Sequence, residues 1–380
     1  MNNTSSVRLS GRQAMWLVVT TILATTLIFL PAWVAAEAKQ DAWLSVLLSM
    51  VVGVVTAWLV STLGRRFPDL TIVQYGERIL GRVLGKVVGL VYAAFFLHIN
   101  TVIVREFGEL LLTGFMPETP LVVFIGTIIV VAAYGAWAGP EVLARVNDFI
   151  LPVILFLLGV SLFLLVNQAN LAALLPLAEE PAGIVRGALA SAVFFSEVII
   201  LAMLIPSLNL RSEAARAGVL GVLVAGFSLM AVTVFATMVF GGERVANLTF
   251  PYLALTRIVS VRGVVERVEF LALGIWVLGG FVKISVFYYA AALASSQWLG
   301  LREYRSTVVP IGLAIGFLSV IQFENIDQIS SFLTTAALFA YLPVTLGLPA
   351  LLLILATLRG LKGGSGTAPG PRGADKEVSP

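Results

Sequence analysis

Residues 190–203 read ASAVFFSEVIILAM, an apolar stretch interrupted by a single carboxylate, Glu197. The longer run from 187 to 207 contains no other acidic or basic residue. A helix of about 20 mainly apolar residues spans the ~30 Å hydrocarbon core of a bilayer. This run therefore predicts a membrane-spanning helix with a charged group near its midpoint.

Runs of the same kind recur along the chain. Hydrophobic residues make up 59% of the 380 residues and charged residues only 12%, about half the ~25% usual in soluble proteins. Dividing the apolar runs at charged or Pro/Gly-rich turns predicts ten spans. They cover approximately residues 12–36, 42–63, 83–113, 119–138, 146–166, 187–207, 214–241, 267–298, 305–321 and 332–358. We expect an all-α polytopic membrane protein, with a transmembrane domain over residues 1–360 and a disordered tail over 361–380.

The composition also excludes several classes of function. The sequence has no cysteine and one histidine, which excludes disulfides, thiolate nucleophiles, and Cys-ligated or His-cluster metal sites. The net charge of +3 is better explained by cytoplasmic loops than by a nucleic-acid partner. We therefore expect a lipid-embedded protein that binds no nucleic acid and no metal and carries no cofactor.

The distribution of basic residues predicts the orientation. An even number of spans puts both termini on one side, and cytoplasmic termini leave 16 Lys and Arg residues inside and six outside. The first run, with Arg8, Arg12 and an Ala-rich end, also has features of a cleaved signal peptide. It is too long for a typical signal-peptide core, so we expect it to remain as the first span.

A second charge lies at the middle of a span. Lys283 is near the centre of WVLGGFVKISVFYY, residues 276–289. Insertion scales put the cost of such a charge at roughly 2.5–3.5 kcal/mol, so each one is a candidate functional group. A buried pair between Lys283 and Glu197 would satisfy both. The pair is either a structural ion pair or part of a site for binding and proton transfer.

The third span carries a polar stripe. His98, Thr101, Arg105 and Glu109 follow one another at gaps of three to four residues and therefore share one helix face, which should point inward. Arg105 and Glu109 are spaced to pair, and Glu106 lies off the stripe, so these three are read as groups near the outer interface. His98 lies deeper, as a packing residue or as part of a site.

Two spans have candidate breaks. Pro31 interrupts the first span after a cluster of threonines, and the sixth span has a candidate break around Ser196. Discontinuous helices in equivalent positions of two inverted repeats indicate the substrate site of a transporter fold. A proline-kinked packing helix is the alternative. The loop over 242–266 predicts a short amphipathic helix on the outer face, which either gates the site or is only interfacial.

Several segments together resemble a known family over residues 9–358. They are LSGRQ at 9–13, LIFLP at 27–31, QDAWLS at 40–45, RRFPDLTIVQYGERILGRVLGKVVG at 65–89, GPEVLARVNDFILP at 139–152 and FPYLALTRIV at 250–259. The chain resembles the spore germination permease-like proteins, the B subunits of nutrient germinant receptors of endospore-forming bacteria. In that family glycine is common where this chain has Thr25, Thr26 and Ser196.

The resemblance implies a fold, partners and a site. It implies the fold of the amino acid, polyamine and organocation transporters: ten helices in a five-plus-five inverted repeat, with broken helices one and six. It implies two partners in the spore inner membrane, a receptor subunit with a large soluble region and a lipoprotein. Carried over by position, and with the first-span break included, the implied ligand-binding residues are Thr25, Thr26, Pro31, His98, Thr101, Phe194, Ser196, Glu197, Trp276 and Lys283.

Three functions fit these observations. The leading hypothesis is the transporter-like subunit of a germinant receptor, which binds a small nutrient, most plausibly an amino acid, and catalyses no covalent reaction. The second is a secondary transporter, coupled to protons through Glu197. The third is a purely structural membrane subunit, which leaves the two intramembrane charges without a role. The first two need the same pocket, so sequence does not separate them.

Overall fold

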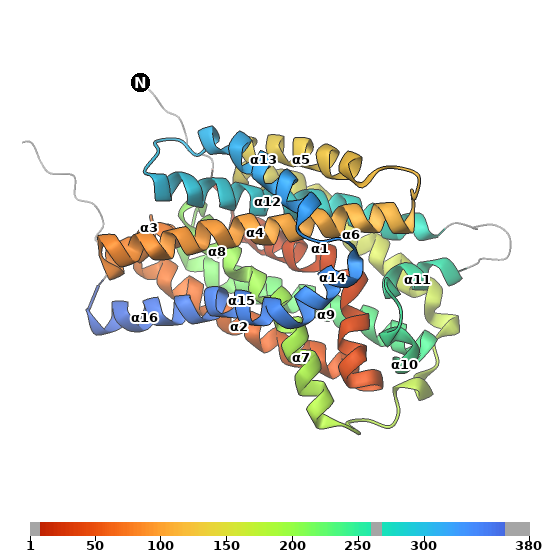
Figure 1. Ribbon diagram of the computed structural model, residues 1–380. Helices are drawn as coiled ribbons and strands as arrows, with labels where there is room; N and C mark the ends of the chain where they lie inside the picture. Colours follow the sequence, from red (N-terminus) through yellow and green to blue (C-terminus); the bar gives the residue numbers. More distant parts are fainter. Residues whose placement is uncertain (1–7, 260–267, 362–380) are drawn as a thin grey trace, which may run out of the picture.

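The computed structural model describes residues 8–259 and 268–361, and this part of the chain folds as a bundle of helices (Figure 1). Eight segments are long and apolar enough to cross a membrane. The first of them, Gly11–Arg66, contains two helices, α1 (Gly11–Ala38) and α2 (Ala42–Arg66), and α13 (Arg305–Ile321) is a shorter apolar helix. Each of the ten predicted spans contains a helix or a group of helices, which confirms the all-α polytopic membrane fold.

The remaining elements follow in chain order. They are α3 (Ile72–Leu80), α4 (Arg82–Gly114), α5 (Leu121–Ala138), α6 (Pro140–Leu165), α7 (Pro181–Ser196), the 3-10 turn η4 (Glu197–Ile200), α8 (Leu201–Leu204), α9 (Ala214–Phe240), α10 (Gly242–Ala246), α11 (Pro251–Ile258), α12 (Glu269–Leu299), α14 (Ile326–Ser331), α15 (Ala337–Leu342) and α16 (Leu348–Leu358). Two π-helical segments, Phe332–Ala336 and Pro343–Gly347, flank α15. The predicted tail lies outside the described residues except for residue 361.

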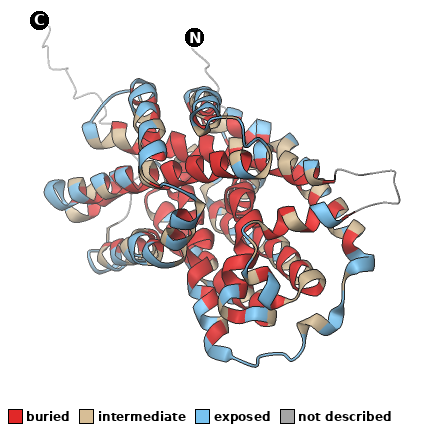
Figure 2. Cartoon of the chain, turned by 45° about the vertical axis from the view of Figure 1, so that its right-hand side comes forward, coloured by how far each residue is buried: buried red, intermediate tan, exposed pale blue. Residues whose placement is uncertain are grey.

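Two segments form the centre of the bundle. Residues 17–35 of α1 are buried without interruption, and so are residues 190–205 of α7, η4 and α8. In contrast, α5 buries only five of its residues, although it is apolar on all sides. A helix that is apolar all round is covered either by protein or by lipid. Figure 2 shows the same division, with buried ribbon in the middle and exposed ribbon at the periphery.

The two central segments differ in continuity. The α-helical hydrogen bonding of the sixth span is interrupted where a break is predicted, because α7 ends at Ser196 and a 3-10 turn begins at Glu197, although the span stays helical from Pro181 to Ser207. The break predicted at Pro31 is wrong, since α1 is one helix from Gly11 to Ala38 with Pro31 inside it. Proline removes one backbone hydrogen bond and kinks a helix without necessarily ending it. In Figure 1 the red ribbon of α1 changes direction along its length.

Contacts between distant segments define the two ends of the bundle. At the Gly11 end, Leu9 pairs with the backbone of residues 207 and 209, Arg211 pairs with Asp69, and Arg359 bonds the carbonyl of Ile79. At the Ala38 end, Lys39 pairs with Glu243 of α10. The start of α1 and the end of α16 therefore lie at the same end, as an even number of crossings requires.

Candidate ligand-binding site

The two intramembrane charges meet at the break in the sixth span. Lys283 of α12 places Nζ 2.9 Å from Oε1 and 2.8 Å from Oε2 of Glu197. The same ammonium donates to Thr25 Oγ1 of α1 at 2.9 Å. The Lys283 and Glu197 side chains are 0% and 4% exposed. The predicted pairing of these two charges is confirmed, and it joins three helices at the centre of the fold.

A third charged group belongs to this cluster, and sequence analysis missed it. Glu106 of α4 is 2% exposed, and its carboxylate interacts with Lys283, Glu197 and Thr25. Its Oε1 atom has no hydrogen-bond partner among residues 8–259 and 268–361. The sequence places Glu106 beside Arg105 and Glu109 and predicts an outer interface group instead. The signal was available, since any charge within an apolar span is a candidate functional group.

The contacts between α4 and α12 set the register of these groups. Phe107 stacks on Trp276 with ring centroids 6.3 Å apart, and Phe96 approaches Phe287 at 6.3 Å. The two helices are therefore antiparallel, and the residues midway between these contacts lie at the level of Lys283. Asn100 is one of them, fully buried, and neither its Oδ1 nor its Nδ2 has a partner.

An aromatic layer covers the charged cluster toward the Ala38 end. Trp33 stacks between Phe29 and Phe194, with centroid distances of 5.3 Å to each. Phe29 also contacts Trp276 at 5.8 Å and Phe250, which precedes α11, at 5.4 Å. Phe194 and Trp276, both predicted site residues, are therefore part of this layer. We call these five side chains the aromatic cap.

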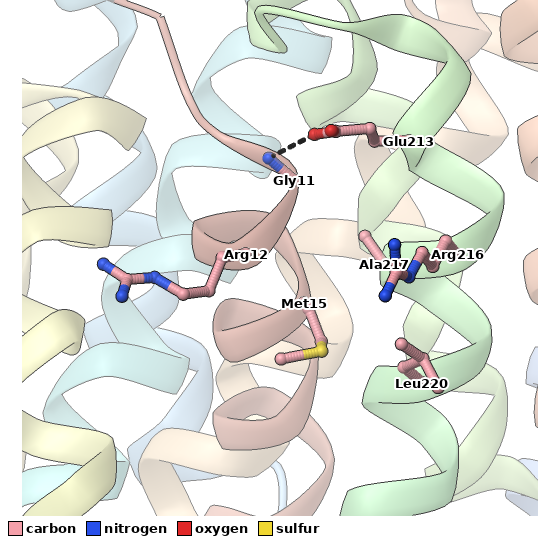
Figure 3. A pocket seen from close by; sticks show the side chains of 7 residues that line it. All are labelled: Gly11, Arg12, Met15, Glu213, Arg216, Ala217 and Leu220. Atoms are coloured by element: carbon pink, nitrogen blue, oxygen red, sulfur yellow. Dashed lines mark hydrogen bonds between the residues drawn. The ribbon is translucent and has the colours of Figure 1, made fainter.

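The Gly11 end is closed by polar contacts. Asp148 of α6 accepts from Gln13 Nε2 at 2.8 Å and lies 3.7 Å from the Arg12 guanidinium. Glu213 accepts from the backbone N–H of Gly11 at 3.0 Å. A separate cavity of about 350 Å³ lies at this end (Figure 3). It is lined by Gly11, Arg12, Met15, Glu213, Arg216, Ala217 and Leu220, none of them a predicted site residue.

The other predicted residues lie at different distances from the charges. Thr26 is buried beside Thr25 and its Oγ1 has no partner, and Pro31 lies in α1 within the buried stretch. Ser196 immediately precedes Glu197 and donates to the Val193 carbonyl at 2.7 Å. Thr101 donates to its own helix, at Leu97 O.

His98 lies outside the charged cluster. It is partly exposed, and its Nδ1 lies 2.7 Å from the hydroxyl of Tyr341, while Gln322 contacts its other nitrogen. The structure therefore brings His98 to an interface of α4 with the C-terminal helices and not into contact with Glu197.

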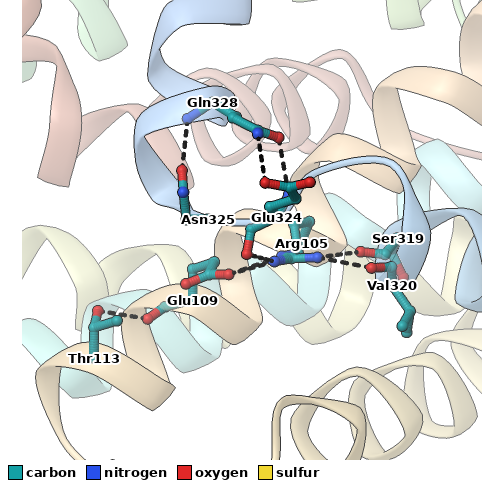
Figure 4. A network of polar contacts seen from close by, with 8 residues as sticks. All are labelled: Arg105, Glu109, Thr113, Ser319, Val320, Glu324, Asn325 and Gln328. Atoms are coloured by element: carbon teal, nitrogen blue, oxygen red, sulfur yellow. Dashed lines mark hydrogen bonds and ion pairs between the residues drawn. The ribbon is translucent and has the colours of Figure 1, made fainter.

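The rest of the polar stripe holds helices together. Arg105 pairs with Glu109, as predicted, with Nη2 2.7 Å from Oε1. The same guanidinium donates to the carbonyls of Ser319, Val320 and Glu324 at 3.0–3.2 Å (Figure 4). These carbonyls lie at and beyond the end of α13, where a helix leaves its acceptors unpaired. We read this network as structural.

Comparisons with known proteins agree with this architecture. A family model described as "Spore germination protein" matches residues 8–328. Spore germination protein KB of Bacillus subtilis (strain 168) is 25% identical over 357 residues, which cover 92% of this chain and 94% of that protein. Spore germination protein YndE of the same organism is 27% identical over 295 residues, covering 76% and 81%.

Two solved transporter structures share the fold at low sequence identity. MhsT in complex with L-phenylalanine superposes with a TM-score of 0.64 at 13% identity, covering 91% of this chain and 98% of that one. Mhp1, a nucleobase-cation-symport-1 family transporter, gives 0.66 at 14% identity, covering 89% and 77%. The predicted transporter-like architecture is thus confirmed.

Proposed function

The chain belongs to the spore germination protein family, and from this premise we propose that it is the transporter-like membrane subunit of a spore germinant receptor. It binds a small nutrient within the bundle and signals germination, and it catalyses no covalent reaction. One observation carries the proposal beyond family membership: Lys283 and Glu197 pair, fully buried, where the sixth span breaks. Intramembrane charges of this kind mark binding sites and ion pathways.

The chemistry of the cluster suits an amino acid. A zwitterion offers a carboxylate to Lys283 and an ammonium group to a carboxylate of the site, so it matches both signs present there. The aromatic cap supplies apolar surface for a side chain and separates the charges from the Ala38 end. Small-molecule sites combine a mainly apolar lining with a few well-placed polar groups in this way.

The wider arrangement follows from the same proposal. The protein lies in the spore inner membrane with both termini in the cytoplasm, as one transmembrane domain over residues 1–360 with a disordered tail. It acts with a receptor subunit that has a large soluble region and with a lipoprotein subunit. The basic residues of the Gly11 end support this orientation, because cytoplasmic loops are enriched in Lys and Arg.

A proton-coupled secondary transporter is the second candidate, favoured by the fold shared with MhsT and Mhp1. Two experiments separate the candidates. Spores lacking this chain, but with intact partners, should fail to germinate in at least one amino acid of a complete panel, and a normal response to all nutrients would contradict the receptor function. Uptake of labelled amino acid into proteoliposomes of the purified chain would instead favour the transporter.

The orientation can be tested with single cysteines, because the native sequence has none. Cysteines at the exposed positions Glu118 and Leu171 are expected to react with an impermeant maleimide added from outside, since both lie at the Ala38 end. Cysteines at the exposed positions Arg65 and Ser212 should react only after permeabilisation. The reverse pattern would overturn the assignment of the termini to the cytoplasm.

The segment at α11 is expected to act as a cover over the site. Phe250 contacts Phe29 of the cap, and the buried Tyr252 hydroxyl lies 2.7 Å from Ser161 Oγ. Phe250→Ala removes an aromatic contact of about 0.5–1.5 kcal/mol, so we expect the half-maximal nutrient concentration to rise several-fold with membrane abundance unchanged. Ile258→Ala, on the exposed side of the same helix, is the control. An unchanged dose response to Phe250→Ala would reduce the segment to an interfacial helix.

A further inference from the structure

The buried cluster carries unequal charge. It contains two carboxylates, Glu106 and Glu197, and one ammonium group, Lys283, all of them at most 3% exposed. Lys283 is fully engaged by Glu197 and by Thr25 Oγ1. Within residues 8–259 and 268–361, Glu106 makes no ion pair of its own. The Glu197–Lys283 pair is therefore neutral by itself, and Glu106 is the surplus acidic group.

Glu106 also has free acceptor capacity directed at the cluster. Its carboxyl group lies within electrostatic range of Lys283 and Glu197 and close to the Thr25 hydroxyl, and among the described residues its Oε1 has no hydrogen-bond partner. A buried carboxylate oxygen without a donor is costly, and removing charge from water is more costly still. Both costs are offset when the carboxyl group takes up a proton or when a cationic donor from outside the chain binds there.

From this geometry we infer that Glu106 binds the ammonium group of the nutrient, an inference that rests on the proposed function of this same site. Lys283 and Glu197 form the floor of the site, since each already neutralises the other. The ligand class that follows is small primary amines, amino acids among them. Recognition depends on the ammonium group more than on the carboxylate, because the cation of the site is already paired.

The test uses the purified full-length chain in nanodiscs and three sets of probes. These are the proteinogenic L-amino acids, their amides, which keep the ammonium and lose the carboxylate, and the matching carboxylic acids without the amine. Binding is measured as a ligand-dependent rise in melting temperature across a concentration series. We expect at least one amino acid and its amide to bind the wild type, and the amine-free acid not to bind.

The deciding variant is Glu106→Gln, which keeps the shape and removes the charge. Loss of a hydrogen bond to a charged group should weaken binding of the amino acid and of its amide by about tenfold or more. Glu109→Gln is the matched control, because Glu109 is buried one turn further along α4 but pairs with Arg105. It should change the melting temperature without ligand and leave affinity within about twofold.

Each outcome bears on a different claim. If no probe stabilises the wild type, the proposed nutrient-binding function fails, and this inference with it. If the wild type binds and Glu106→Gln binds equally well, the role of Glu106 is wrong while the proposed function stands. If Glu106→Gln does not fold, the affinities of the three probe sets for the wild type test the inference. An amine-free acid that binds the wild type as tightly as the amide would overturn it.

Discussion

Lys283→Met is expected to remove most of the protein from the membrane, because it leaves two buried carboxylates without a cation. Breaking a buried ion pair by removing one partner typically costs about 3–5 kcal/mol. Here Glu197 loses its ion-pair partner and Glu106 loses a nearby positive charge. Glu197→Gln should be milder, since Lys283 still has Glu106 and Thr25 within reach. Membrane abundance and the melting temperature of the purified chain measure both effects.

The double variant separates structure from binding. Glu197→Gln with Lys283→Met removes both charges of the pair, so its cost should be less than the sum of the two single costs. We expect abundance to recover relative to Lys283→Met while the nutrient response stays lost. Recovery of both abundance and response would make the pair purely structural. Strictly additive losses would mean that the two residues do not interact.

The fold was largely predictable because the bilayer restricts the backbone conformations that a chain can adopt. Every backbone polar group in lipid must be bonded within the chain, so an apolar run of the right length forms a helix. The ten predicted spans therefore reappear as helices, although α6 begins at Pro140 and α7 at Pro181, several residues before their predicted starts. The additional helical turns of α6 and α7 precede the apolar run and contain polar residues, so hydropathy does not detect them.

The break in α1 and the role of Glu106 were mispredicted for a different reason. Both depend on neighbours that are distant in sequence. Whether Pro31 breaks or only kinks a helix depends on how α1 is packed, and it is buried on all sides through residue 35. Whether Glu106 faces the site depends on the register of α4 against α12. Helical spacing put Glu106 beside the stripe, and tertiary packing turned that neighbouring face toward Lys283.

The pair of Glu197 and Lys283, by contrast, was predictable without a structure. Each was the one charge near the middle of its span, and burial in lipid or protein leaves such groups few partners. The same reasoning does not extend to His98, because a half-buried imidazole can be satisfied by neutral neighbours, here Tyr341 and Gln322. A charged residue within a span identifies a site more reliably than a neutral polar residue does, because the free energy needed to bury a charge is larger.

The second large effect is expected at Arg105, which precedes Glu106 in α4 but directs its guanidinium to the end of α13. Its guanidinium is 3% exposed and serves Glu109 and three carbonyls at and beyond the end of α13. Arg105→Met strands a buried carboxylate and leaves those acceptors unpaired, so we expect a loss of about 3–5 kcal/mol of stability. Arg65→Met is the control, since Arg65 is exposed and its side chain bonds only Thr62 within the described part of the chain. It should change stability by at most about 0.5 kcal/mol.

Arg105→Lys tests whether the geometry of the guanidinium matters beyond its charge. Lysine keeps the charge opposite Glu109, but one ammonium group cannot match the planar fork that reaches several acceptors together. We therefore expect Arg105→Lys to fall between the wild type and Arg105→Met in melting temperature. Arg105→Met with Glu109→Gln should recover part of the loss, because no charge is then stranded. If Arg105→Met were as stable as Arg65→Met, the network would contribute nothing. Junctions of α4 with α13 and α14 would then rest on apolar packing alone.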